Sequence, residues 1–566
     1  MSQPVKKQLS TTIDFLDELI LSGRAYTGDH MRQMLAHLAS LAVTRIDWVV
    51  DNRDKQDVLH HTPFENKANV LEYVVAEAHA AGMEVHAQFK PFETGAVRYV
   101  PHCFPKPAGV PLLEESRGIY WDIDPFVIAH PHMRLQRRPG NWNPGGRIGS
   151  IKLVKEDAEP LGIDPRRLEI WVGKINGELS RYEQPFQVRQ SIEWRSRFPV
   201  ARRCLVLSLD GLSIDETFRF LHVRYPAVEG PGTFGNSILE LMEIYDTGGR
   251  RIPSSPAADR GWDLYALKRL GRFPMDTMCR YGRSEELREL FRDEAAIRAA
   301  YHDFHAYDVS ENNPRKVLDA DGYAGVARGK SEHIGGALNP VYPEVRQYWL
   351  GLVKHYIRWG VDGVNFRVSN HSCPTEDRDD FGFNEPVLAA CGDRVDRDAA
   401  HRINGTAYTE FLREAAFELK KHGLCATVHI HAGFAYPGDM GAEQFWAKMP
   451  PNFEWQWETW IREIADVIYL KGLHTVTDAH AAHFVDTYTR LARRYGKKVI
   501  YVSTNSELRF DGDHSKVESE MNRVLDHDGI DGYDLYETAS YMRMNEEGRV
   551  ELSPDIARLV RQHFHG

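Results

Sequence analysis

Cysteine is scarce and dispersed in this chain. Only six of the 566 residues are cysteine, and no two of them have the spacing of a CxxC pair. The pattern therefore indicates neither a disulfide scaffold nor a zinc ribbon. The chain also lacks a P-loop and an HExxH motif, so nothing favours a P-loop nucleotide site or a zinc protease.

The chain also lacks an excess of positive charge and any long apolar run. With 70 Lys and Arg against 81 Asp and Glu, the net charge is −11, which argues against a nucleic-acid partner. Residues 1–12 are polar, and no run approaches the length of a membrane span. We therefore expect a cytoplasmic protein without a membrane partner, although a secreted chain without its leader would look the same.

Composition is otherwise that of a globular protein, with 42% hydrophobic and 27% charged residues. A length of 566 residues exceeds one ordinary hydrophobic core, so we expect two or three domains. The 12 Trp and 24 Tyr suit stacking on sugar rings, but aromatic side chains more often fill large cores. The oligomeric state stays open, a homo-oligomer included.

Short apolar runs alternate with amphipathic segments through most of the chain. Segments 31–42 and 69–81 have apolar residues at helical spacing. Strands are predicted near residues 47, 87, 337, 365, 427, 468, 500 and 534. Eight such units predict an α/β fold of the (β/α)₈ TIM-barrel type. A doubly wound sheet is the alternative, but it rarely needs eight parallel strands in succession.

The alternation of apolar runs with amphipathic segments stops between residues 146 and 256. Here short alternating runs are separated by turn signals such as Asn176-Gly177 and Asp210-Gly211, which predicts an inserted β-sandwich. The predicted organisation has four parts: strands one and two with the following loop in 1–145, the insertion in 146–256, a mixed linker or loop region in 257–330, and strands three to eight in 331–566.

Four segments of the chain resemble a known family. They are residues 77–89, 129–134, 338–346 and 361–366. They are similar to the bacterial glycosyl hydrolases described as family-10-like, which are barrel proteins related to clan-A glycosidases. The resemblance extends over roughly residues 30–135 and 330–545 and omits the β-rich insertion. It implies a barrel enzyme that cleaves glycosidic bonds in an oligo- or polysaccharide.

Glycosidic cleavage uses two carboxyl groups, and in a barrel of this type the ligand lies at the carboxyl ends of the strands. Glu537 directly follows the last predicted strand, so we expect it to be the general acid. Glu507 lies five residues past strand seven, which by resemblance carries the nucleophile in clan-A glycosidases. Glu93 and Asp51 follow strands two and one and are the next candidates. Once the barrel closes, we expect Glu537 to lie beside the first strand and Asp51.

Other polar residues at predicted strand ends are candidates for substrate binding. With Glu93 and Asp51, they are Lys90, Asn339, Arg367, Asn370, His371, His429, His431 and Lys471. The cations among them hint at an anionic sugar, such as a uronic acid or a sulfated sugar. The resembled family often has an acidic residue where this chain has Arg367, so a carboxylate role at this position is excluded.

His429 and His431 alternate and therefore share one face of strand five. A His-x-His pair suits substrate hydrogen bonding or metal binding, but the spacing fixes no further ligand. We therefore expect no metal and no cofactor. The leading hypothesis is a glycoside hydrolase with Glu537 and Glu507 as its carboxylate pair. The alternatives are a non-catalytic carbohydrate-binding barrel, which Arg367 favours, and a metal-dependent hydrolase that uses the two histidines.

Overall fold

The computed structural model describes residues 7–14, 27–50, 70–93, 112–113, 118–119, 126, 130–140, 145–155, 157–160, 164–175, 178–195, 202–225, 239–256, 323–329, 333–370, 378–392, 396–431, 434, 449–471, 478–503, 510, 514–545 and 547–564. Three predicted site residues, Asp51, His371 and Glu507, lie outside these parts of the chain.

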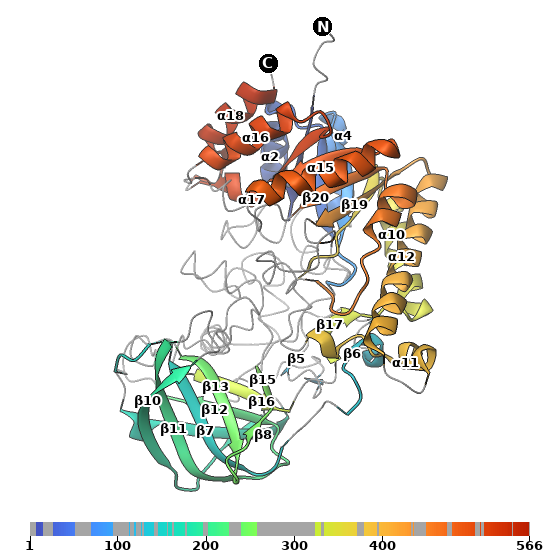
Figure 1. The fold of residues 1–566 in the computed structure, drawn as a ribbon. Helices are drawn as coiled ribbons and strands as arrows, with labels where there is room; N and C mark the ends of the chain where they lie inside the picture. Colours follow the sequence, from blue (N-terminus) through green and yellow to red (C-terminus); the bar gives the residue numbers. More distant parts are fainter. Residues whose placement is uncertain are drawn as a thin grey trace.

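Eight parallel strands form a closed barrel, as the sequence predicts (Figure 1). In order around the barrel they are β1 (Gln8–Ile13), β2 (Arg45–Val50), β3 (Glu84–Phe89), β18 (Gly363–Phe366), β19 (Cys425–His431), β20 (Val467–Lys471), β21 (Lys498–Val502) and β22 (Gly532–Tyr536). Pairing of β1 with β22, which places Thr12 opposite Tyr536, closes the ring. All eight carboxyl ends therefore lie at one end of the barrel.

One predicted barrel strand was wrong, and one strand of the barrel was not predicted. The first barrel strand is β1, in the amino-terminal stretch whose polarity hid it, although Ser10, Thr11 and Thr12 are buried. The segment near residue 337 is β17 (His333–Leu338), which pairs antiparallel with β6 (Arg134–Gln136) outside the barrel. Residues 1–145 thus supply three barrel strands and residues 331–566 supply five. Local apolar content marks a buried strand, but only its pairing partners decide whether it belongs to the barrel.

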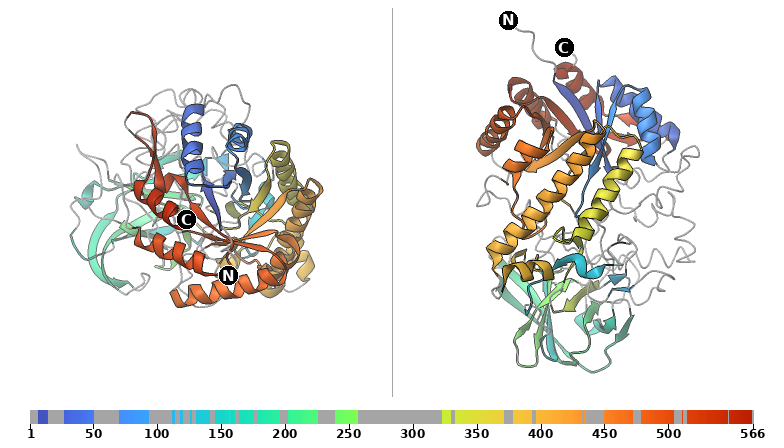
Figure 2. Two further views of the ribbon diagram at one scale, coloured as in Figure 1. Left: turned by 90° about the horizontal axis from the view of Figure 1, so that it is seen from above. Right: turned by 90° about the vertical axis from the view of Figure 1, so that its right-hand side faces the viewer.

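Helices surround the barrel, as the view along its axis shows (Figure 2, left). The described helices are α2 (Gly28–Ser40), α4 (Val70–Ala80), α10 (Pro343–Arg358), α11 (Glu385–Cys391), α12 (Arg397–Lys421), α14 (Trp457–Thr459), α15 (Asp478–Arg494), α16 (Ser515–Asp526), α17 (Thr538–Tyr541) and α18 (Pro554–Phe564), of which α11 lies away from the barrel (Figure 1). The predicted helices at 31–42 and 69–81 are confirmed as α2 and α4. Among the described helices, none combines the length and the apolar character needed to cross a bilayer.

The outward faces of the strands and the inward faces of the helices share one apolar core. Helix α10 begins with Pro343, where a missing N–H costs little, and its buried face includes Trp349. Trp349 packs edge-on against Phe411 of α12, with ring centroids 5.1 Å apart. Phe411 in turn contacts Phe366 of β18 at 5.8 Å. Burying each such side chain contributes about 1.5–3 kcal/mol, so this layer holds the strand ends in place.

The region predicted to be rich in β structure contains two five-stranded antiparallel sheets (Figure 1). The first has the order β10 (Gln187–Arg195), β11 (Arg202–Ile214), β7 (Ile148–Lys155), β13 (Leu239–Asp246) and β14 (Arg251–Ile252). The second has the order β15 (Ser254–Pro256), β16 (Tyr323–Arg328), β12 (Phe220–Arg224), β8 (Glu169–Ile175) and β9 (Glu178–Arg181). Buried residues of both sheets, such as Leu207 and Leu221, belong to one apolar cluster. Strand β16 comes from the region predicted to be linker.

Small pairs of strands and short helical turns complete the described structure. The remaining strands are β4 (Leu112–Leu113) with β5 (Gly118–Ile119), and β23 (Met542–Met544) with β24 (Val550–Leu552). Single 3₁₀ turns occur at Pro131–Met133, Pro165–Arg167 and Arg378–Asp380, and a π-helical turn at Trp460–Ile464.

Candidate active site at the carboxyl ends of the barrel strands

The interior of the barrel is lined mainly by polar side chains. Alternate residues of a strand point to opposite faces, and hydrogen bonds between strands that are not neighbours show which residues point inward. The buried polar and aromatic residues on these inward positions are Ser10, Thr12, Arg45, Asp47, His86, Gln88, Asn365, Arg367, Thr427, His429, His431, Tyr469, Lys471, Asp534 and Tyr536. Barrels of this type are usually filled by branched aliphatic residues, so the polar interior needs a chemical explanation.

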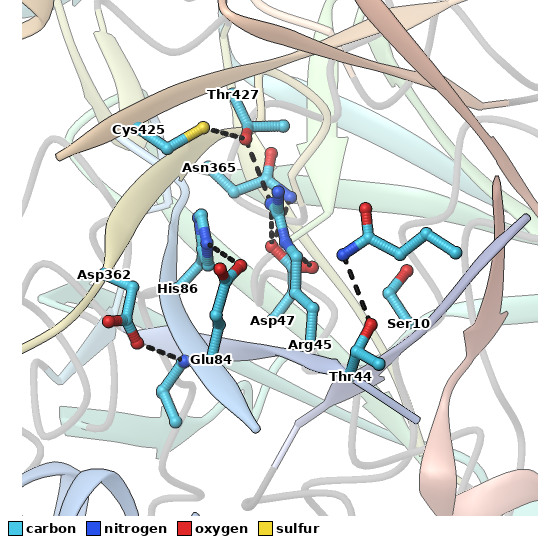
Figure 3. A network of polar contacts seen from close by, with 12 residues as sticks. Ser10, Thr44, Arg45, Asp47, Glu84, His86, Asp362, Asn365, Cys425 and Thr427 are labelled. Carbon is cyan, nitrogen blue, oxygen red and sulfur yellow. Dashed lines mark hydrogen bonds and ion pairs between the residues drawn. The ribbon is translucent and has the colours of Figure 1, made fainter. Parts of the chain in front are cut away.

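At the amino-terminal end of the barrel, Arg45 and Asp47 form a buried bidentate ion pair (Figure 3). Arg45 donates to the two carboxylate oxygens of Asp47 at 2.9 and 2.8 Å. Asn365 and Tyr469 also donate to this carboxylate, at 2.7 and 2.6 Å. Burial acts to raise the pKa of Asp47, but the Arg45 charge and these hydrogen bonds outweigh it, so the pKa lies below its ordinary value. Arg45 also donates to the Thr427 hydroxyl at 3.0 Å, so this pair connects the four strands β2, β18, β19 and β20.

The network continues through Asp534 at the middle of the barrel. Ser10 and Thr12 donate to its two carboxylate oxygens at 2.8 and 3.0 Å. The Tyr469 hydroxyl donates to Ser10 at 3.0 Å and so links Asp534 to the Arg45 pair. Burial and the negative charge of Asp47 raise the pKa of Asp534 to about 7. The barrel therefore contains a carboxyl group that titrates near neutral pH.

Arg367 lies where the interior opens at the carboxyl ends of the strands. Its guanidinium donates to the Tyr536 hydroxyl at 2.7 Å, to the Gln88 side-chain oxygen at 3.2 Å and to Ser369 at 3.0 Å. Burial acts to lower the pKa of Arg367, but Tyr536 and the charges of Glu93 and Glu537 outweigh it and raise the pKa. Arg367 is therefore a buried cation whose hydrogen-bond partners among the described residues are neutral.

Carboxylates and cations meet at this end of the barrel. The Lys90 ammonium nitrogen lies 3.3 Å from Glu93 and 3.7 Å from Asp14. Glu537 directly follows β22, is 6% exposed, and acts electrostatically on Arg367 and Lys471. We call the set of charged residues here the mouth, which consists of Asp14, Lys90, Glu93, Arg367, Lys471 and Glu537.

The neighbour of Glu537 differs from the predicted one. The sequence predicted that Glu537 lies beside Asp51 once the barrel closes. Because β22 pairs with β1 and not with β2, the first acidic residue beside this strand end is Asp14, whose charge acts on Tyr536. The predicted neighbour was wrong because the strand before Asp51 is the second strand of the barrel, and β1, which was not predicted, is the first.

Lys471 is the last residue of β20, and no ion pair joins it to a carboxylate in the part of the chain that the structure describes. Its ammonium nitrogen lies 3.1 Å from the centroid of the Tyr536 ring. That nitrogen is buried and has no hydrogen-bond partner among the residues that the structure describes. Burial and the charge of Arg367 hold the pKa of Lys471 well below its ordinary value. The mouth therefore contains one lysine paired with acids and one that is not.

His429 and His431 are buried on the inward face of β19. The His429 ring stacks on Tyr469 with centroids 5.3 Å apart. Burial, followed by the charges of Lys471 and Arg367, holds the pKa of His429 well below its ordinary value, so the imidazole is neutral. Within the described ranges, no group of three or more His, Cys, Asp or Glu side chains could hold a metal ion.

Asn339 lies outside the barrel, and Asn370 follows the end of β18. Asn339 was predicted at the end of a barrel strand, but it donates to the side chains of Asn384 and Asn404 at 2.8 and 3.0 Å, outside the barrel. This prediction was wrong because β17 is not a barrel strand. Asn370 donates to the Val368 carbonyl at 2.9 Å and braces the chain that follows β18.

Several residues of this network were missed by the sequence analysis. They are Asp14, Gln88, Asp47, Asp534, Tyr469 and Tyr536. Apart from His429 and His431, the residues predicted from the sequence lie at or after strand ends, whereas the missed residues, Asp14 excepted, lie within strands. Polar residues at every second position, as at Ser10 and Thr12 or at Asp534 and Tyr536, were the available signal.

Comparisons with known proteins add little to this geometry. A scan against models of protein families and a search of curated proteins each give no match. Among solved structures, the chain is similar to a pyruvate kinase from Cryptosporidium parvum, with 9% identity and a TM-score of 0.30, over 99% of this chain and 69% of the other. A likeness of this level carries no inference about activity.

Proposed function

We propose that this chain is a glycoside hydrolase of the family-10-like group and that its active site is the mouth. The observation that carries the proposal is that two carboxylates lie near one buried cation. The charges of Glu93 and Glu537 both raise the pKa of the Arg367 guanidinium. Two carboxyl groups on either side of a sugar are the chemical requirement for glycosidic cleavage.

In the proposed reaction, Glu537 donates a proton to the glycosidic oxygen and the leaving group departs as an alcohol. Glu93, whose side chain is 15% exposed, either attacks the anomeric carbon or takes a proton from the attacking water. A carboxyl separation of about 5–5.5 Å gives retention, and one of about 6.5–9.5 Å gives inversion. Glu507 stays the candidate for the second carboxylate that the resemblance implies.

The cations of the mouth support an anionic sugar as substrate. Arg367 donates to Ser369, Gln88 and Tyr536, which are all neutral, so its charge is available to a carboxylate or sulfate of the substrate. Lys90 differs because it already contacts Asp14 and Glu93. A guanidinium also binds a planar carboxylate through two parallel hydrogen bonds, which favours uronic acids.

We also propose that the two antiparallel sheets pack as one inserted β-sandwich that extends the sugar-binding cleft. The observation behind this proposal is the single apolar cluster that residues of both sheets share. Deleting such a module should leave the barrel folded while weakening the binding of long oligosaccharides more than that of short ones.

The proposal is tested by incubating the full chain with oligosaccharides that carry uronic acid or sulfate groups and with their neutral counterparts, followed by chromatography of the products. We expect cleavage of an acidic substrate, a lower kcat/KM for its neutral counterpart, and loss of cleavage in E537Q. The matched control is E458Q, which changes an exposed glutamate on α14 and should cleave like the parent. Equal cleavage by E537Q would remove Glu537 from the mechanism.

A non-catalytic carbohydrate-binding barrel is the second candidate. Arg367 at a position that is often acidic in the resembled family favours it. Binding of an acidic oligosaccharide with no product, by a folded chain, would support this candidate against the first. A transition metal retained through purification and coordinated by His429 or His431 would instead favour a metal-dependent hydrolase.

A further inference from the structure

Two buried lysines of the mouth have opposite surroundings. Lys90 lies 3.3 Å from Glu93 and 3.7 Å from Asp14, so two carboxylates hold its ammonium group. Lys471 is also buried, with 9% of its surface exposed. Its nitrogen rests on the face of the Tyr536 ring and has no hydrogen-bond partner among the described residues. The same mouth therefore contains a paired lysine and an unpaired one.

The surroundings of Lys471 favour the neutral amine. Burial removes the water that would solvate an ammonium group, and the positive charge of Arg367 opposes a second cation beside it. The charge of Glu537 and the ring face of Tyr536 favour the ammonium form, but that ring also lies 5.3 Å from the Arg367 guanidinium. The pKa of Lys471 falls well below its ordinary value, so burial and Arg367 prevail. A neutral primary amine has a free electron pair and is a nucleophile.

We propose that Lys471 is a covalent binding residue that forms a Schiff base with a small carbonyl compound that also carries a carboxylate. The carbonyl carbon lies at the Lys471 nitrogen, and the carboxylate of the ligand pairs with Arg367, whose hydrogen-bond partners in the protein are neutral. Glu537 acts electrostatically on both Arg367 and Lys471, and in this proposal it delivers and removes the proton.

The chemical step needs no oxidant or reductant. The Lys471 amine attacks the carbonyl carbon, a carbon–nitrogen bond forms, and the π electron pair moves to the oxygen. The oxygen gains a proton as the nitrogen loses one, which gives a carbinolamine. Glu537 in its protonated form then donates a proton to the hydroxyl group, which leaves as water while the carbon–nitrogen double bond forms. The nitrogen, now an iminium, returns its N–H proton to the Glu537 carboxylate, so amine and carbonyl compound together yield an imine and one water molecule.

Reductive trapping tests this inference. The full chain is incubated with pyruvate, a small 2-oxo acid, and sodium cyanoborohydride, which delivers hydride to the imine carbon while water supplies the proton on nitrogen. Peptide mass mapping then locates the secondary amine. We expect the label on Lys471 and not on Lys90 or the exposed Lys498, because each unit of pKa below that of an ordinary lysine raises the neutral fraction about tenfold.

Variants and a second ligand sharpen the test. K471R should lose the label, since a guanidinium stays protonated, whereas K498R at the opposite end of the barrel should keep it. Hydroxyacetone, which has a carbonyl but no carboxylate, should label Lys471 at least about tenfold less than pyruvate, and R367Q should remove that preference. The comparison of Lys471, Lys90 and Lys498 within the parent chain holds even if a variant fails to fold.

Three results would overturn the inference. The first is labelling of Lys90 or Lys498 to the same extent as Lys471. The second is a folded chain that carries no label, and the third is a label that is unchanged in K471R. The inference does not rest on glycosidic cleavage, because the label is read by mass and not by turnover. A chain that is labelled at Lys471 but cleaves no glycan would support this inference and contradict the proposed glycosidase activity. A chain that cleaves a glycan but is not labelled at Lys471 would support the glycosidase and contradict this inference.

Discussion

Arg367 donates a 2.7 Å hydrogen bond to the hydroxyl of Tyr536 across the barrel, from the fourth strand to the eighth. The same Tyr536 ring carries the Lys471 nitrogen on its face, 3.1 Å from the centroid. One phenol therefore contacts two basic side chains at the carboxyl ends of strands that are not neighbours. The proposed substrate binding and the proposed covalent chemistry of the mouth both use these two side chains.

Y536F should destabilise the fold and disorganise the mouth together. Loss of the hydroxyl removes one hydrogen bond from a buried guanidinium, and bonds to charged groups contribute about 1.5–3 kcal/mol. We expect a loss of that size in the free energy of unfolding, measured by urea denaturation. Y495F, which changes a half-buried tyrosine after α15, is the control and should cost less than about 0.5 kcal/mol. Equal effects of the two changes would show that Arg367 does not need this bond.

R45M should be among the most destabilising single changes in the barrel. It leaves the buried Asp47 carboxylate without its cation, and breaking a buried ion pair costs about 3–5 kcal/mol. The control is R413M, because the pair of Arg413 with Glu463 has a similar distance of 2.9 Å but side chains that are 48% and 39% exposed. We expect that change to cost at most about 1 kcal/mol in the same denaturation assay. Similar losses from both variants would contradict a structural role for the buried pair.

Asp534 should make the stability depend on pH near neutrality. Its pKa is about 7 in the folded chain and near the ordinary 3.8 when unfolded, so the folded chain binds more protons between these values. The stability contributed by the protonated carboxyl is therefore complete below about pH 4 and is lost as the pH rises through 7, by up to about 1.4 kcal/mol per pH unit.

D534N should remove this contribution. Denaturation curves recorded between pH 5 and pH 8 should show a smaller loss of stability with rising pH in D534N than in the parent. D555N, which changes an exposed aspartate at the start of α18, should keep the slope of the parent. The assignment fails if parent and D534N have the same slope.

E537Q should abolish most turnover while leaving the fold intact. The amide keeps the shape of the side chain but has no acidic proton, and general acid–base catalysis contributes about 10²–10⁴-fold in rate. We expect kcat on the true substrate to fall by at least about the lower factor, with an unchanged melting temperature. Parent-like activity in E537Q would make Glu537 a structural carboxylate and would move the search to Glu93, Asp14 and Glu507.

The sequence alone determined most of the repeating elements, because their signals are local. Apolar residues at helical spacing predicted α2 and α4, and apolar runs predicted the seven barrel strands from β2 to β22. The ends of such runs also predicted which residues lie at the carboxyl ends of parallel strands, namely Lys90, Arg367, Lys471 and Glu537. Each of these inferences needs only the pattern of exposure within a short segment.

Tertiary structure alone decided how the barrel closes and what fills it. Strand β1 is polar because its inward residues Ser10 and Thr12 bind Asp534, more than 500 positions away in the chain, so no local hydrophobic pattern marks it. Segment β17 has the composition of a barrel strand, but its partner is β6. Strand pairing and the contacts of inward-facing side chains depend on residues distant in sequence. For this reason only the structure shows that Lys90 pairs with two carboxylates. It likewise shows that the Lys471 nitrogen has no hydrogen-bond partner among the described residues.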